Sequence, residues 1–325
     1  MERGLVSCEW LRAELGREYT DDEKPPRLVD ATWYLPGSPF AGPEGSSGAQ
    51  ADHIAGPRLP GAVFFDIDGV AAQHPAGLKH MLPSEEMFAA AMAAMGITPT
   101  TRVVVYDRHG VFSSPRFWWT LKLAFGHPAG VAVLDGGLPR WKELGYPLED
   151  GEAAMPDAPA PVGQWKRVPE AVWDLDQVRA NVGSGEALLV DARPAPRFLG
   201  SAPEPRPGMR GGHVPGSLNM PFNLLLTGGP ARAVLPRGEL EELLIAAGVL
   251  ERTGAGAEGL STPGRKVVVA SCGSGLTACV VGLALHQLGE RPPAQWAVYD
   301  GSWAEWGARP DTPIVRQGAD GAVEP

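Results

Sequence analysis

Short apolar runs alternate with longer segments of helical character along this chain. Residues 103–106 and 267–270 are β-branched and too short for helices, which predicts buried strands. Residues 84–95 open with Ser-Glu-Glu and continue rich in alanine and methionine, as a capped helix does. Residues 276–288 form a second helical segment, which ends at Gly289. The alternation predicts an α/β fold with mostly parallel sheets flanked by helices.

The same pattern of motifs occurs twice along the chain. Four short motifs of the first half return in the second half at offsets of 155 to 165 residues: 29–31 as 190–192, 59–62 as 214–217, 103–107 as 267–271, and 133–136 as 298–301. Collinear matches of this kind indicate an internal duplication. Residues 151–164 lie between the copies and are rich in alanine, proline and glycine, which is typical of a linker. We therefore predict an N-terminal domain over 1–150, a linker over 151–164 and a C-terminal domain over 165–325.

Composition agrees with two globular domains. The chain has 325 residues, 44% of them hydrophobic and 20% charged, with 42 glycines and 33 prolines that predict long loops. A net charge of −10 argues against binding to nucleic acid or to anionic lipid. No apolar run reaches the roughly 18 residues of a membrane helix, and the N-terminus has no signal-peptide pattern. We expect no membrane association and a cytoplasmic location, with the mitochondrion as the alternative.

Three cysteines are too few to staple a chain of this length and suit a reducing compartment. Cys272 directly follows the predicted strand over 267–271 and precedes a glycine-bearing loop and a helix. Backbone N–H groups and the positive end of a helix then point at the sulfur and stabilise a thiolate. Cys272 is the candidate nucleophile, and a buried apolar cysteine is the alternative. Cys279 is interpreted as core or as a resolving thiol, and Cys8 as part of an N-terminal helix.

Two other motifs compete for the same loop. Gly273, Gly275 and Ala278 fit the dinucleotide pattern G-x-G-x-x-A, but no acidic residue ends a strand about 20 residues later. A cysteine phosphatase needs an arginine six positions after its cysteine, and Ala278 stands there. The phosphatase interpretation fails on that residue, and the dinucleotide interpretation stays as an alternative.

Longer motifs carry a resemblance to a known family. They are VDATWYLPG (29–37), LPGAVFFDID (59–68), VVVYD (103–107), SSPRFWW (113–119), VLDGGLPRW (133–141), GHVPGSLNMPF (212–222), CGSGLTA (272–278) and YDGSWAEW (299–306). Together they resemble the two-domain rhodanese family of sulfurtransferases over nearly the whole chain. Within that family the chain is similar to the mercaptopyruvate enzymes, which carry CGSG where thiosulfate-preferring members place basic residues after the cysteine. The resemblance implies two tandem rhodanese-like domains, each a mostly parallel sheet flanked by helices.

The resemblance also implies a set of site residues. Its catalytic residues map onto Cys272, Ser274, His80 and Asp68, and its substrate-binding residues onto Arg197, Arg206, Gly273, Gly275, Leu276 and Thr277. Arginine suits a carboxylate and a keto oxygen because its hydrogen bonding is planar and bidentate. His74 competes with His80, and Arg193 is expected to be structural. No metal site is expected, because the histidines are scattered singly.

The first copy differs from the second at the decisive position. At an offset of 164 residues, Cys272 corresponds to Arg108, so we expect the N-terminal domain to be catalytically silent. Arg58 precedes Leu59 where the family usually has a histidine. Residues 37–56 and 253–264 look like loop insertions.

The expected activity is transfer of sulfur from 3-mercaptopyruvate through a Cys272 persulfide to a thiol acceptor such as thioredoxin, or to cyanide, with release of pyruvate. Hydrogen sulfide is a further expected product. We expect no metal or organic cofactor, and a monomer or weak dimer. A thiosulfate:cyanide sulfurtransferase and a non-enzymatic rhodanese-like sulfur-carrier module are the alternatives.

Overall fold

The computed structural model describes residues 4–20, 23–151, 160–253, 260–289, 295–317 and 323–324. The chain divides into two compact units, each assembled from several chain segments. Unit 1 comprises residues 1–72, 83–167 and 226–234; unit 2 comprises 73–82, 168–225 and 235–325. Residues 152–159 of the predicted linker and 254–259 of the predicted second insertion lie outside the described residues.

Each unit contains one five-stranded sheet in which every pairing is parallel. In unit 1 the order is β1 (Leu5–Val6), β5 (Val131–Leu134), β4 (Val103–Tyr106), β2 (Arg27–Asp30) and β3 (Val63–Phe64). In unit 2 the order is β6 (Val172–Trp173), β12 (Trp296–Tyr299), β11 (Val267–Ser271), β7 (Ala187–Asp191) and β8 (Leu218–Asn219). The two orders are the same when strands are matched in chain order, so the repeat in the sequence is a repeat of topology. The predicted α/β class is confirmed.

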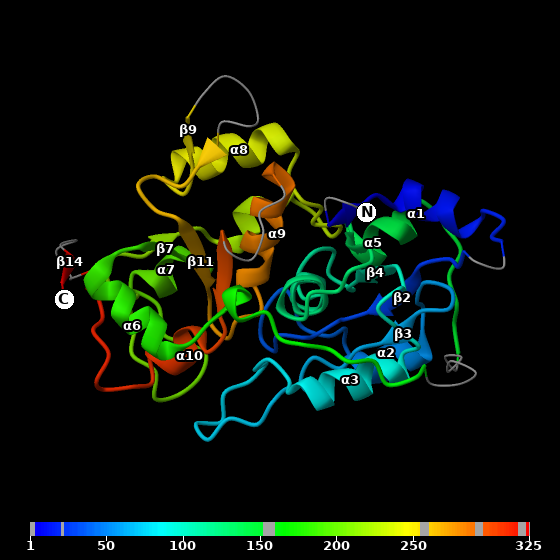
Figure 1. Ribbon diagram of the computed structural model, residues 1–325, viewed down its shortest axis with the longest axis horizontal. Helices are drawn as coiled ribbons and strands as arrows, with labels where there is room; N and C mark the ends of the chain where they lie inside the picture. Colours follow the sequence, from blue (N-terminus) through cyan, green and yellow to red (C-terminus); the bar gives the residue numbers. More distant parts are fainter. Residues whose placement is uncertain are drawn as a thin grey trace. The chain divides into compact units, whose positions relative to one another are not determined.

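Helices lie on both faces of each sheet (Figure 1). Unit 1 contains α1 (Cys8–Leu15), α2 (Ala49–Ala55), α3 (Glu85–Ala94), α4 (Ser114–Trp119), which continues as a π-helical turn (Thr120–Ala124), and α5 (Gly137–Glu143). Unit 2 contains α6 (Leu175–Ser184), α7 (Ala195–Phe198), α8 (Arg237–Ala246), α9 (Ala278–Leu288) and α10 (Ser302–Trp306), with 3₁₀ turns at Pro169–Ala171 and Phe222–Leu225. Small antiparallel pairs are formed by β9 (Glu251–Arg252) with β10 (Leu260–Ser261) and by β13 (Arg316–Gln317) with β14 (Val323–Glu324).

Local sequence signals account for the helix ends. The Ser84 side chain accepts a hydrogen bond from the Met87 N–H at 3.1 Å, so α3 begins where the cap was predicted. The helix predicted over 276–288 begins two residues later, at Ala278. The Cys279 and Val280 N–H groups donate to the carbonyls of Leu276 and Thr277, three residues earlier, so a tighter turn precedes the α-helix.

The hydrophobic core of unit 2 fixes the strands and helices whose ends carry the candidate site. On one sheet face, Val178 of α6 and Trp303 and Trp306 of α10 pack with Leu189 and Val269. The opposite face carries α9, which contacts β11 and β12, and α8, which contacts α9. The tryptophans of the YDGSWAEW motif are therefore core residues that fix α10 against the sheet.

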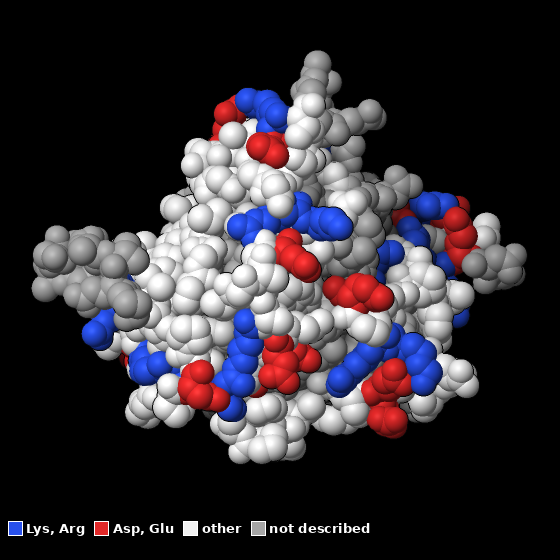
Figure 2. All heavy atoms as spheres, turned by 60° about the vertical axis from the view of Figure 1, so that its left-hand side comes forward, with Lys and Arg blue, Asp and Glu red and all other residues white. Residues whose placement is uncertain are grey.

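Charge is mixed on the face of the molecule shown in Figure 2. On this face, basic and acidic side chains of the described residues lie beside one another instead of forming one basic area (Figure 2). None of the helices in the described part of the chain is both long and apolar enough to span a membrane.

Candidate active site

Cys272 lies at the carboxyl end of β11, and its side chain is 1% exposed. Its backbone N–H donates to Ser302 Oγ at 3.2 Å, and its carbonyl accepts the Trp303 N–H at 3.0 Å. Both backbone groups are therefore tied to the first residues of α10, which fixes the point from which the thiol projects.

The loop after Cys272 is short and held by backbone hydrogen bonds. The Gly273 carbonyl accepts the Ala304 N–H at 2.9 Å, and the loop leads through Gly275 into α9. The Cys279 thiol donates to the Gly275 carbonyl at 3.4 Å, and its side chain is buried. The loop thus leads from Cys272 to the N-terminal end of an 11-residue helix, which is the positive end of the helix dipole.

The other two cysteines do not share this setting. Cys279 is a core residue of α9, as its apolar surroundings predict. Cys8 is buried in α1, where its thiol donates to the Asp135 carbonyl at 3.6 Å. Burial raises the pKa of the Cys8 thiol to about 12, so this cysteine stays protonated at neutral pH.

Arg197 lies beside the first residue of the loop. A methyl group placed on Gly273 would lie 3.3 Å from Arg197 Nη2, so the guanidinium lies over the backbone next to Cys272. Arg197 belongs to α7 and forms an ion pair with Glu204, to which its Nε donates at 3.2 Å. Glu204 is absent from the set of residues that the sequence singled out. The signal that points to it is an acidic residue between two candidate arginines in a proline-rich loop.

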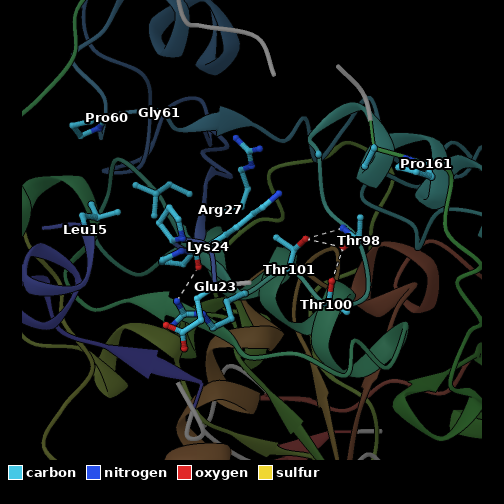
Figure 3. Close-up of a pocket in the computed structure, with 16 residues that line it drawn as sticks. Leu15, Glu23, Lys24, Arg27, Pro60, Gly61, Thr98, Thr100, Thr101 and Pro161 are labelled. Carbon is cyan, nitrogen blue, oxygen red and sulfur yellow. Dashed lines mark hydrogen bonds between the residues drawn. The ribbon is translucent and has the colours of Figure 1, made fainter. Parts of the chain in front are cut away.

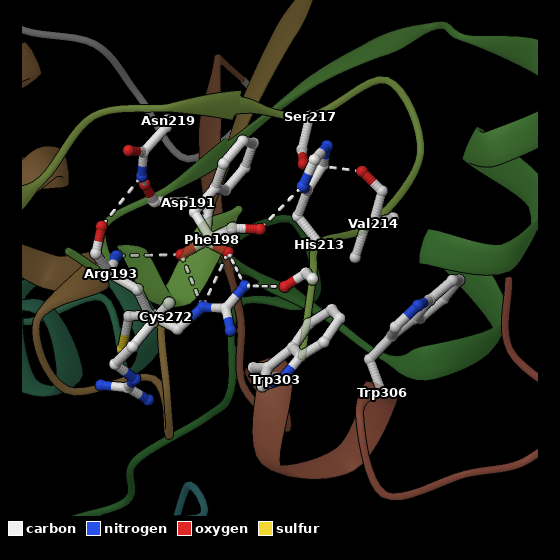
Figure 4. A network of polar contacts seen from close by, with 12 residues as sticks. Asp191, Arg193, Phe198, His213, Val214, Ser217, Asn219, Cys272, Trp303 and Trp306 are labelled. Atoms are coloured by element: carbon white, nitrogen blue, oxygen red, sulfur yellow. Dashed lines mark hydrogen bonds and ion pairs between the residues drawn. The ribbon is translucent and has the colours of Figure 1, made fainter. Parts of the chain in front are cut away.

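Arg193 is structural, as predicted. Its Nε and Nη2 donate to Asp191 at 2.6 to 3.1 Å, Nη2 also donates to the Gly212 carbonyl at 2.8 Å, and Nη1 donates to Glu204 at 2.8 Å. Its guanidinium stacks 4.2 Å from the ring centre of Trp303. Figure 4 shows Arg193 between Asp191 and Trp303, on the same side of the sheet end as Cys272.

Arg206 follows Glu204 on the same loop and is half-buried. Within the described chain, its side chain makes no hydrogen bond or ion pair. The structure therefore brings Arg197 to the cysteine loop and leaves Arg206 outside the Asp191–Arg193–Glu204 network.

The histidine of the predicted relay reaches the cysteine loop. Residues 73–82 belong to unit 2, and His80 Nδ1 lies 2.9 Å from Ser274 Oγ. The histidine is 2% exposed and has a φ of +64°, a rare value for a non-glycine residue. The Leu82 N–H donates to Asp300 Oδ2 at 2.7 Å and anchors the segment just after the histidine.

Asp68 and His74 are placed differently from His80. Asp68 belongs to unit 1, where Oδ2 accepts the Trp33 Nε1–H at 2.9 Å. His74 Nε2 lies 3.9 Å from Glu305 Oε1. The structure joins His80 to Ser274, and the role of Asp68 stays a prediction.

Strand register corrects the residue that matches Cys272 in the first copy. Asp30 pairs with Tyr106 in unit 1, and Asp191 pairs with Ser271 in unit 2. Because Asp30 and Asp191 are equivalent, the residue after Tyr106 corresponds to Cys272, and that residue is Asp107. The predicted equivalence with Arg108 is wrong by one position. The reason is that the valine run 103–105 can be matched to 267–269 or, one residue later, to 268–270, and only the strand register selects the second match.

Asp107 fills its own loop with a carboxylate. Oδ2 accepts the N–H groups of Phe112, Ser113 and Ser114 at 2.9 to 3.0 Å and the Ser114 hydroxyl at 2.6 Å. Oδ1 accepts the His109 N–H at 2.9 Å. The loop of unit 1 is thus an anion site occupied by its own chain and without a thiol.

Residues 37–56, predicted as a loose insertion, contain α2. From this helix, His53 Nδ1 lies 3.0 Å from Asp30 Oδ2, and the Asp52 carbonyl accepts Arg108 Nη2 at 2.7 Å. Arg58 is buried and its Nη1 donates to the carbonyls of His53, Ile54 and Gly151. The residue that departs from the family pattern therefore fixes the end of α2.

Unit 1 also holds a hollow of about 840 Å³. Its polar lining includes Lys24, Arg27, Thr98, Thr100, Thr101 and Arg102 (Figure 3). The described lining contains no cysteine or histidine, so the hollow does not offer the sulfur chemistry of the Cys272 loop. Among the described residues, no group of three or more His, Cys, Asp or Glu side chains is placed to hold a metal ion.

A model of the rhodanese-like domain matches residues 24–144 and 174–309. The chain belongs to the rhodanese family. It is 37% identical over 312 residues to the 3-mercaptopyruvate sulfurtransferase of Escherichia coli, covering 95% of this chain and 97% of that protein. It is 38% identical over 328 residues to the mitochondrial thiosulfate/3-mercaptopyruvate sulfurtransferase 1 of Arabidopsis thaliana, covering 95% and 77%.

A solved crystal structure of a related protein has the same fold as this chain. The crystal structure of the E. coli 3-mercaptopyruvate sulfotransferase SseA matches with a TM-score of 0.68 at 32% identity, covering 92% of this chain and 98% of that one. The prediction of two rhodanese-like domains is confirmed.

Proposed function

We propose that this chain is a 3-mercaptopyruvate sulfurtransferase that carries sulfur as a persulfide on Cys272. The observation that carries the proposal is the Cys272 loop itself. A buried thiol at a strand end precedes a helix, with Arg197 beside Gly273 and with His80 in hydrogen-bond contact with Ser274 of the same loop. The names of the E. coli and Arabidopsis relatives support the reaction.

The first half-reaction is a nucleophilic displacement at sulfur. The Cys272 thiolate attacks the substrate sulfur, a S–S bond forms, and the carbon–sulfur bond breaks. Its electron pair goes to the substrate carbon and gives the enolate of pyruvate, which takes one proton to become pyruvate. The sulfur stays on the enzyme as the persulfide, so catalysis is covalent.

The side chains around Cys272 are assigned roles according to the hydrogen bonds and protons that they can supply. Arg197 and Arg206 hold the carboxylate and keto oxygen of the substrate. The Ser274 hydroxyl and His80 move the proton that the enolate takes, and Asp68 is the third member of the relay that the family resemblance implies. Gly273, Gly275, Leu276 and Thr277 surround the outer sulfur, where loop N–H groups stabilise its negative charge.

The second half-reaction returns the thiolate. An acceptor thiolate attacks the outer sulfur and forms a new S–S bond, whereas cyanide forms a carbon–sulfur bond and gives thiocyanate. In both cases the bond between the outer sulfur and Cys272 breaks, and Cys272 leaves as the thiolate. Thioredoxin, a small thiol or cyanide serves as acceptor, and reduction of the transferred sulfur by a further thiol releases hydrogen sulfide.

We further propose that the protein is located in the cytoplasm, with the mitochondrion as the alternative. We propose a monomer or a weak dimer as its oligomeric state.

The test follows sulfur and pyruvate together. The protein is exposed to 3-mercaptopyruvate, pyruvate is measured, and intact mass is recorded before an acceptor is added. We expect a gain of one sulfur on the peptide that contains Cys272, and its loss on adding a thiol. Cys272→Ser is expected to abolish both signals, while the matched variant Cys279→Ser keeps them. Sulfur on another peptide, or pyruvate release by Cys272→Ser, would reject the proposal.

A further inference from the structure

Glu204 forms an ion pair with Arg197, the arginine whose guanidinium lies beside Gly273 of the cysteine loop. We propose that Glu204 determines donor specificity: it positions Arg197 beside Gly273 and cancels its charge, so that the site favours a monocarboxylate sulfur donor over a dianion such as thiosulfate. This inference rests on the proposed function.

Glu204 is shared by two arginines. Its side chain is 1% exposed; Oε1 accepts Arg193 Nη1 at 2.8 Å, and Oε2 accepts Nε and Nη2 of Arg197. A carboxylate buried to this degree is strongly held when both oxygens are bound by guanidinium donors. Glu204 therefore has a fixed position from which it orients Arg197.

Arg193 and Arg197 differ in how firmly their side chains are held. Arg193 is 1% exposed and is also bound by Asp191, Gly212 and the Trp303 ring, so it forms the rigid end of the network. The Arg197 side chain is 21% exposed and reaches the backbone of Gly273. The backbone N–H of Trp303 also donates to the Cys272 carbonyl, so the rigid end is tied to the cysteine.

The charges of the network cancel. Asp191 and Glu204 carry one negative charge each, and Arg193 and Arg197 carry one positive charge each. Arg197 thus offers directed N–H donors to a substrate, but the four charges together exert little net electrostatic attraction on an anion. A monocarboxylate needs the donors, whereas a dianion gains most from an uncompensated cation, because Coulomb attraction scales with ligand charge.

Neutralising Glu204 changes both properties. Glu204→Gln leaves one uncompensated positive charge next to Gly273, and the Gln amide group donates where a carboxylate accepted. We expect the ratio of kcat/KM for thiosulfate to that for 3-mercaptopyruvate to rise about tenfold or more, given the strength of a close charge pair at a partly buried site. The KM for 3-mercaptopyruvate rises more than its kcat falls, because Arg197 loses its anchor.

Two further variants separate charge from shape. Glu204→Asp keeps the charge but shortens the side chain, so the KM values for both donors rise in parallel and the donor ratio stays near that of the unchanged protein. Glu239→Gln removes the same charge from an exposed position in the first turn of α8 and leaves both donors unaffected. If Glu204→Gln does not fold, a donor ratio that shifts in Glu204→Asp overturns the inference, and a constant ratio with a higher KM for both donors supports it.

The experiment measures pyruvate from 3-mercaptopyruvate and sulfite from thiosulfate, with one acceptor, at two ionic strengths. The gain with thiosulfate in Glu204→Gln is expected to shrink at high salt. An equal ratio in Glu204→Gln and Glu239→Gln rejects the role of Glu204. Absence of turnover in the unchanged protein instead rejects the proposed function, so the two failures are distinguishable.

Discussion

Asp107 and Cys272 occupy the same position of the repeat, each directly after the central strand of its sheet. In unit 1 the position carries a carboxylate that accepts four backbone N–H groups and one hydroxyl. In unit 2 it carries a thiol at the start of a loop of the same kind. The same local fold thus holds an internal anion in one copy and is free to hold a sulfur anion in the other.

The internal anion is expected to stabilise unit 1. Asp107→Asn keeps the size of the side chain but replaces a charged acceptor and brings an NH₂ group toward backbone donors. Hydrogen bonds to charged groups are strong, so we expect the unfolding free energy to fall by about 2 to 3 kcal/mol. Urea unfolding at neutral pH measures it. Glu44→Gln removes one charge from an exposed position of the same unit and is expected to change stability by less than about 0.5 kcal/mol.

Ser274 and His80 are expected to act as one unit. Because His80 Nδ1 lies 2.9 Å from Ser274 Oγ, removing either group breaks the same proton path. Ser274→Ala and His80→Asn are each expected to lower kcat for 3-mercaptopyruvate by about 10²-fold, and the double variant by no more than either alone.

The histidine variant is chosen for its backbone. Asparagine tolerates the left-handed φ of +64° at position 80, so loss of activity does not come from strain. Equal melting temperatures of the variants check this point. Fully multiplicative losses of kcat would contradict a shared proton path.

The sequence predicts the repeated part of this fold well. The short β-branched runs form β4 and β11, and Ser84 caps α3 where expected. Strand type follows from the local apolar pattern, and the duplication predicts that the two units share one strand order. The position of Cys272 at a strand end is likewise a local property, so the residue pattern alone is enough to predict it.

Other parts depend on contacts between distant segments. Residues 73–82 and 226–234 each belong to the unit opposite to their place in the sequence, and no local signal marks that exchange. Glu204 has no helical or strand pattern, and its importance comes only from its two arginine partners. The one-residue error at Asp107 arose because runs of similar apolar residues can be matched in two registers, and strand pairing is needed to choose between them.

Arg58 is expected to be a stability determinant of unit 1. It is buried, and its Nη1 binds three carbonyls, those of His53, Ile54 and Gly151. Arg58→Lys keeps the charge but cannot reach these acceptors with the same planar geometry, so we expect a loss of about 2 to 3 kcal/mol in unfolding free energy. Thermal and urea unfolding measure it. Arg140→Lys, at a half-exposed position of α5, is the matched control, and an equal effect of both would contradict the role of Arg58.

Asp135 makes the stability of unit 1 depend on pH. Burial, opposed by hydrogen bonds from the N–H groups of Val234 and Gly136, raises the pKa of this carboxyl to about 6. The Val234 N–H, from the segment 226–234, donates to Oδ1 at 2.8 Å. A carboxyl whose pKa is higher in the folded than in the unfolded chain stabilises the fold most below the unfolded pKa. That contribution is lost as pH rises through the folded pKa.

Asp135→Asn removes the titration while keeping an oxygen that can accept the Val234 N–H. Between pH 4.5 and 7.5 the unchanged protein is therefore expected to lose about 2 kcal/mol of unfolding free energy relative to Asp135→Asn, because a pKa near 6 compares with about 3.9 in an unfolded chain. The measurement is urea unfolding of both proteins across this range. Glu44→Gln, at an exposed position, is the control and is expected to show no such divergence. Parallel pH profiles for the unchanged protein and Asp135→Asn would show that Asp135 is already ionised in the fold at low pH.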